Sequence, residues 1–217
     1  MDSTHIVKDY SKSANLIDYY ANSLTEIANS TGDNLEGNCF TEHQTTIRNE
    51  QLLTKRINLF AAAKHGPSIL EVGFNAGHSA LLLLLGCNPG TKIDFLDIGG
   101  HPYVVPCYEY ILKIRSEIPI LLYLGNSKHI LPLRVLKQKE HDVYDVIHMD
   151  GGHSNDCVVN DLTLCYQLCK TGGWLIVDDA SGFILEEINR FLQLGLVKKV
   201  PGQLDTNLYP HCILEKI

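Results

Sequence analysis

From residue 68 onward, the sequence alternates between short apolar runs and longer stretches in which apolar residues recur at helical spacing. The apolar runs cover residues 68–73, 92–97, 120–124, 143–149 and 174–178, and the helical stretches between them cover residues 77–87, 103–117, 127–137 and 155–169. Strands separated by helices of about ten residues or more need crossover connections, which produce a mostly parallel sheet with helices on both faces. We therefore expect an α/β protein with a doubly wound, Rossmann-like sheet.

The two ends of the chain depart from this alternation. After a helix at 184–194, two short strands at 197–200 and 211–214 follow without a helix between them, which predicts an antiparallel hairpin at one sheet edge. Before residue 68, the pattern predicts a helix at 14–27 and a second at 42–63 that stops at Gly66-Pro67. We expect a helical arm at 1–45 and one main domain at 46–217. Within the arm, 35–44 is either a lid or a static packing segment.

Composition excludes several classes of protein. The formal net charge is -7 and no basic run occurs, which argues against nucleic-acid binding. The longest apolar run, residues 80–85, is far shorter than the roughly 20 residues of a membrane span. The first residues do not resemble a signal peptide, and the seven cysteines form no Cys-x-x-Cys pair. We expect a cytoplasmic protein with reduced thiols; a homodimer is compatible with the helical arm.

Ligands of open parallel sheets bind beyond the carboxyl ends of the strands, so the residues that follow each strand are the candidates for a site. Gly73 and Gly77 follow the first strand with G-x-x-x-G spacing, not the G-x-G-x-x-G of dinucleotide folds. This spacing disfavours a nicotinamide dehydrogenase and favours a nucleoside ligand without a pyrophosphate. Asp97, after the second strand, is placed to accept hydrogen bonds from ribose hydroxyls. A glycine-lined turn without a ligand is the alternative.

A set of ordered motifs carries a family resemblance. The motifs are residues 71–79 (EVGFNAGHS), 96–103 (LDIGGHPY), 125–127 (GNS), 150–154 (DGGHS) and 172–179 (GGWLIVDD). In this order they resemble class I S-adenosylmethionine-dependent methyltransferases, within the small-molecule O-methyltransferase branch that includes catechol O-methyltransferase. The resemblance implies a seven-stranded sheet in the order 3-2-1-4-5-7-6, with strand 7 antiparallel.

The resemblance also implies a binding site for S-adenosylmethionine. It places Gly73 and Gly77 against the methionine part, Asp97 on the ribose, and Asn126 with Ser127 near the adenine. The expected cofactor-binding residues are Glu71, Gly73, Asn75, Gly77, Ser79, Asp97, Asn126, Ser127 and Asp150.

Three carboxylates suggest a metal site. Asp150, Asp178 and Asp179 follow two strands that are neighbours in the expected sheet, and carboxylates brought together repel one another unless a cation or protons compensate. Oxygen ligands favour Mg²⁺ or a similar divalent cation. Asp179 stands where the catechol-type enzymes have an asparagine, which could shift the preference toward calcium or manganese. Alternatively, these residues only cap a helix and line the cofactor loop, with no metal.

His153 is the candidate catalytic base. It lies where the catechol-type enzymes carry a catalytic lysine, and an imidazole can accept a proton at neutral pH. The alternative is a loop histidine bound to backbone. His148, inside the fourth strand, is expected to be a hydrogen-bonded core residue and not a ligand.

Together these features predict an S-adenosylmethionine-dependent methyltransferase that methylates an oxygen of a small hydroxylated molecule with the help of a divalent metal. Two alternatives remain: a metal-independent O- or N-methyltransferase, and a non-catalytic cofactor-binding module. The acceptor itself has no signature in the sequence.

Overall fold

The computed structural model describes residues 2–41, 48–137, 141–204, 206 and 209–217. Seven strands form one sheet in the order β3-β2-β1-β4-β5-β7-β6. The strands are β1 (Ser68–Val72), β2 (Lys92–Asp97), β3 (Ile120–Leu124), β4 (Tyr144–Met149), β5 (Cys169–Val177), β6 (Val197–Lys199) and β7 (Cys212–Lys216). β1 to β5 pair in parallel, and β7 lies antiparallel between β5 and β6. This topology confirms the expected fold and strand order.

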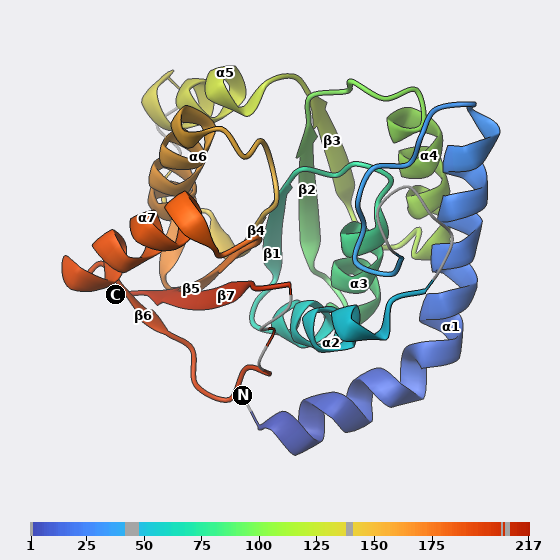
Figure 1. The fold of residues 1–217 in the computed structure, drawn as a ribbon, viewed down its shortest axis with the longest axis horizontal. Coiled ribbons are helices and arrows are strands. Elements are labelled where there is room, and N and C mark those ends of the chain that lie inside the picture. Colours follow the sequence, from blue (N-terminus) through green and yellow to red (C-terminus); the bar gives the residue numbers. More distant parts are fainter. Residues whose placement is uncertain (1, 42–47, 138–140, 205, 207–208) are drawn as a thin grey trace.

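Helices cover both faces of the sheet (Figure 1). They are α1 (Ser3–Ser30), α2 (Leu53–Ala62), α3 (His78–Gly86), α4 (Val104–Ile114), α5 (Ser127–Pro132), α6 (Asn155–Leu168) and α7 (Gly182–Gln193), with a 3-10 turn at Glu50–Leu52 and a π turn at Leu133–Lys137. Two apolar cores pack the helices against the sheet. The first contains residues of helices α1, α2, α3 and α4, and the second contains residues of helices α5, α6 and α7. Among the described residues, no helix combines the length and the apolar character needed to cross a membrane.

Several element boundaries differ from the predicted ones. α1 is much longer than 14–27, because Asp2 caps its N-terminus by accepting a hydrogen bond from the backbone N–H of Thr4 at 3.0 Å. β5 begins at Cys169 and not near Trp174, since its first residue already pairs with Tyr144 of β4. The predicted helix at 127–137 stops being α-helical after Pro132.

The second predicted helix, 42–63, begins later in the chain. Residues 42–47 lie outside the described residues, but Arg48 forms an isolated β-bridge with Thr41, and Asn49 caps the following turn through Gln51. The backbone of Asn49 is extended, with φ -106° and ψ 108°, so a helix cannot run through it.

A fully buried arginine on α2 joins the two segments of this bridge. Arg56 donates from Nη1 to the carbonyls of Cys39 and Asn49, at 3.1 and 3.2 Å, and its guanidinium lies 5.2 Å from the ring centre of Phe40. The backbone N–H of Asn49 also donates to the Phe40 carbonyl at 2.9 Å. Arg56 therefore fixes both segments of this isolated bridge to α2.

Candidate active site

A cavity of about 940 Å³ opens at the carboxyl ends of the parallel strands. Most of the predicted site residues line it: Gly73, Asn75, Ser79, Asp97, Asn126, Ser127, Asp150, His153, Asp178 and Asp179. Glu71 and Gly77 do not line the cavity. Glu71 is fully buried below it, and Gly77 is the N-cap of α3. The cavity is of the size that small-molecule and cofactor sites usually have.

The turn after β1 depends on a glycine. Gly73 has φ +97°, and a Cβ at this position would lie 1.9 Å from the carbonyl oxygen of Asp150. The backbone N–H of Gly73 donates to Leu96 at 2.8 Å, so the turn is tied to β2 as well as to the loop after β4. The backbones of the loops after β1 and β4 can approach this closely only without a side chain at residue 73.

Two polar residues of the site are held in place by backbone contacts. Asp97 accepts from the N–H of Asn75 and of Gly99, both at 2.7 Å, and is 7% exposed. Each carboxylate oxygen has a further lone pair with which it can accept from a ligand hydroxyl. Asn126 caps α5 by accepting from Lys128 at 2.9 Å.

Ser127, the next cavity residue, has a partner that the sequence analysis missed. Its hydroxyl donates to Asp161 Oδ2 of α6 at 3.0 Å, and burial raises the pKa of this carboxyl. Asp161 lies in the middle of a helix whose apolar pattern gives no indication of a site.

The predicted metal carboxylates fall into two groups that share Asp150. One donor atom from each of His148, Asp150 and Asp178 lies within 4.8 Å of the others, and the same holds for Asp150, His153 and Asp179. The first group is mostly buried, whereas in the second His153 is exposed and Asp150 and Asp179 are half-buried. Asp178 and Asp179 are consecutive in the chain but belong to different groups.

A lysine that sequence analysis did not identify contacts the first group. Lys55 of α2 lines the cavity and its ammonium forms a buried ion pair with Asp178 Oδ2. Burial opposes the charge on Lys55, but the carboxylates of Asp178 and Asp150 outweigh it and raise the lysine's pKa. Burial and the neighbouring Asp150 carboxylate raise the pKa of Asp178, and Lys55 opposes this shift. A lysine among the apolar residues of a helix carries no motif, so only the fold reveals this contact.

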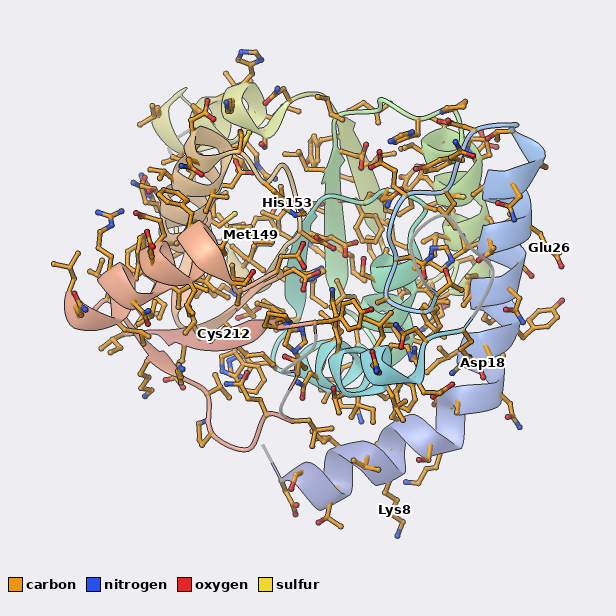
Figure 2. The ribbon with its side chains drawn as sticks, viewed as in Figure 1. Lys8, Asp18, Glu26, Met149, His153 and Cys212 are labelled. Atoms are coloured by element: carbon orange, nitrogen blue, oxygen red, sulfur yellow. The ribbon has the colours of Figure 1, made fainter. Side chains whose placement is uncertain are left out.

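His153 lies on the exposed side of the cluster. Figure 2 shows it beyond the carboxyl end of β4, near Met149, and both residues line a small adjoining pocket. Its Nε2 is 3.3 Å from Asp179 Oδ2 and 3.9 Å from Asp150 Oδ1. The contact with Asp150, followed by the charge of Asp179, raises the pKa of His153. The side chain is 57% exposed, so it is accessible to a molecule in the cavity.

The arm covers part of the cavity. Residues 36–39 and 41 line it, and His101 holds this segment by contacting Asp33 at 2.8 Å and Glu36 at 3.5 Å. Asn75 donates to the Gly37 carbonyl at 3.1 Å. Of the predicted lid, 35–44, the described part is therefore packed against the site, and residues 42–44 lie outside the described residues.

The residues present fit a divalent cation. Asp178 Oδ1 and His148 Nε2 are buried and have no hydrogen-bond partner among the described residues, and both residues belong to the first donor group. Unpartnered buried donors and acceptors are costly, so a cation shared between them would stabilise the cluster.

Comparison with solved structures shows a shared fold. An O-methyltransferase from Bacillus cereus in complex with SAH matches with a TM-score of 0.62 and 14% identity, over 92% of this chain and 90% of that one. A putative O-methyltransferase from Klebsiella pneumoniae matches with 0.57 and 14%, over 95% and 96%. A protein from Corynebacterium glutamicum matches with 0.61 and 15%, over 99% and 97%. No curated protein matches the sequence.

The family comparison covers the parallel strands at whose ends the cavity opens. The family model described as a methyltransferase domain matches residues 70–180, which is more than half of the chain and extends from β1 through β5. The resemblance to S-adenosylmethionine-dependent methyltransferases is thus confirmed by both the match and the fold, and the chain belongs to the methyltransferase domain family.

Proposed function

We propose that this protein transfers the methyl group of S-adenosylmethionine to a hydroxyl oxygen of a small molecule, with the assistance of a divalent cation. The observation that carries this proposal is the position of the acidic cluster. Asp150 belongs to both donor groups, and its backbone carbonyl meets the glycine turn of the cofactor loop at Gly73. The loop after β4 therefore contributes Asp150 to the cluster and also packs against the glycine turn of the cofactor region.

The cofactor region is suited to a nucleoside. Asp97 is buried, held by two backbone N–H groups, and retains lone pairs for ribose hydroxyls. Asn126 and Ser127 line the same cavity. Bound S-adenosylmethionine would supply an electrophilic methyl group on its sulfonium.

The acceptor would bind beside the cluster. A divalent cation held by the cluster would lower the pKa of an acceptor hydroxyl. His153 is exposed to the cavity and is placed to take the hydroxyl proton, and Asp179 would stabilise the resulting imidazolium. Leu52 and Tyr209 add apolar and aromatic surface to the wall near Lys55. These walls support a small, partly apolar acceptor.

Transfer of a labelled methyl group to a panel of hydroxylated aromatic and aliphatic compounds tests this function. We expect turnover that is lost in a chelator and restored by a divalent cation. Asp150→Ala and Asp178→Ala should lose turnover, His153→Ala should lose most of it across pH 6 to 9, and the exposed His129→Ala should not. Turnover that persists in the chelator would favour a metal-independent enzyme.

Binding of S-adenosylhomocysteine, measured by calorimetry, tests the cofactor separately. Binding without turnover on the whole panel would favour a non-catalytic module. A homodimer and a cytoplasmic location stay predictions.

A further inference from the structure

A fully buried carboxylate and histidine lie below the acidic cluster. Glu71 of β1 and His148 of β4 are paired in the register of these strands, and both side chains have 0% exposure. His148 Nδ1 lies 2.8 Å from Glu71 Oε1. The reaction proposed above gives neither side chain a role. The burial of these two ionisable side chains inside the sheet is therefore not explained by that reaction.

The contact with Glu71 determines what the other nitrogen can do. When Nδ1–H donates to a carboxylate, the neutral imidazole has its lone pair on Nε2, and the ring orientation is fixed. Histidines that bind metals in proteins almost always have such a partner on the second nitrogen. A histidine that served only as core would need a partner for Nε2 as well.

Nε2 has no such partner among the residues that the structure describes, and Asp178 Oδ1 has none either. His148, Asp150 and Asp178 nevertheless each place a donor atom within 4.8 Å of the others. The expectation that His148 is a satisfied core residue is therefore wrong for one of its two nitrogens. A group that accepts lone pairs from all three residues would account for both unpartnered atoms.

Asp179 is separated from this buried set. Its backbone is left-handed, with φ +48°, and its side chain is 46% exposed and contacts His153. Lys55 binds Oδ2 of Asp178, whereas Oδ1 of that carboxylate has no hydrogen-bond partner among the described residues. The ammonium of Lys55 also offsets part of the negative charge of the cluster.

We propose that His148 is a metal ligand, and that it binds a divalent transition-metal ion together with Asp150 and Asp178. Glu71 is a positioning residue that orients the imidazole. The inference rests on the proposed function only for the presence of a cation. A nitrogen donor favours Mn²⁺, Fe²⁺, Co²⁺ or Zn²⁺ over Mg²⁺ and Ca²⁺, which prefer oxygen ligands alone.

Mn²⁺ binding to the full chain tests this ligation without reference to turnover. Electron paramagnetic resonance gives the affinity from the loss of the free-ion signal, and its pulsed form detects a directly bound nitrogen through ¹⁴N coupling. We expect the wild-type protein to bind Mn²⁺ with ¹⁴N coupling. His153→Gln and Asp179→Asn should keep this coupling, because both residues are outside the proposed set. His148→Gln should lose the coupling and at least tenfold in affinity.

Glu71→Gln separates ligation from a purely structural role. It should keep the ¹⁴N coupling while the affinity falls about 10- to 100-fold, as for other partners of metal-bound histidines. Should His148→Gln fail to fold, the coupling in wild type and in His153→Gln still decides the question.

Three results would overturn the proposal. Mn²⁺ bound without ¹⁴N coupling would refute ligation by His148 and leave metal-assisted transfer intact. Coupling that disappears in His153→Gln and remains in His148→Gln would place the cation between Asp150, His153 and Asp179. Methyl transfer in a chelator, together with no Mn²⁺ binding, would remove the metal from the proposed function as well.

Discussion

Replacing Lys55 by methionine tests whether its ammonium stabilises the acidic cluster. The change keeps most of the apolar stem and removes the charge, which leaves the Asp178 carboxylate, 3% exposed, without its cationic partner. Removing one partner of a buried ion pair typically costs about 3–5 kcal/mol, because the remaining charge is neither solvated nor paired. We expect Lys55→Met to lower the free energy of unfolding by about this amount at pH 7.5.

The loss should depend on pH in a definite direction. Burial and Asp150 raise the pKa of Asp178, and without Lys55 it rises further. Near pH 5 the Asp178 carboxyl is protonated in both folded proteins, so the loss in Lys55→Met should be small there. As the pH rises, the wild-type carboxyl ionises before that of the variant, so the stability of the variant falls further below that of the wild type.

Urea denaturation followed by circular dichroism at pH 5 and 7.5 measures both effects. Lys64→Met is a matched control, since Lys64 pairs with Asp9 at 2.6 Å but is 41% exposed, and it should change stability far less. The double variant Lys55→Met/Asp178→Asn should recover more than half of the loss. The reasoning is refuted if Lys55→Met stays within about 1 kcal/mol of wild type, or if the double variant recovers nothing.

Three further predictions concern the cofactor loop and its cover. Gly73→Ala should abolish S-adenosylhomocysteine binding in calorimetry, because its Cβ would meet the Asp150 carbonyl; Gly90→Ala, with φ +82° and open space, should bind normally. Burial lowers the pKa of His78 to about 4, so the unfolded state takes up the proton first, and about 3 kcal/mol of stability should be lost between pH 7 and 4. In His78→Gln, the free energy of unfolding measured by urea denaturation should depend less on pH between pH 7 and 4. His101→Asn should speed amide hydrogen exchange in residues 33–37, whereas unchanged exchange would show that the Asp33 contact does not hold the arm.

The sequence predicted the fold, and it predicted that the residues at the ends of the strands lie around one cavity, because both follow from local patterns. Alternating apolar runs and helical stretches dictate the sheet, and the residues after each strand must meet at one edge. Contacts between distant segments were not predictable in this way. Lys55 reaches Asp178 across 123 positions, and the pairing of His148 with Glu71 depends on the register between β1 and β4. No local pattern specifies either contact.

The predicted start of the second helix was wrong for a related reason. The predicted helix at 42–63 rested on spacing alone, whereas the cap at Asn49 and the bridge at Thr41 decide where α2 can begin. The side chain of Asn49 also donates to Tyr209 at 2.9 Å, a contact that joins the segment before α2 to the segment before β7. The order of the helices along the chain does not show that these segments touch.

The buried Arg56 has a consequence for how new acceptor selectivity could arise. Its guanidinium holds the carbonyls of Cys39 and Asn49, so both of these positions are fixed to α2. Asn38, Cys39 and Thr41 line the cavity, and so does Leu52, three residues after Asn49. Substitutions at Asn38, Thr41 and Leu52 would therefore change the wall of the cavity without moving the backbone that Arg56 holds. This wall is a natural place for evolution, or a protein engineer, to diversify the substrate range of the scaffold.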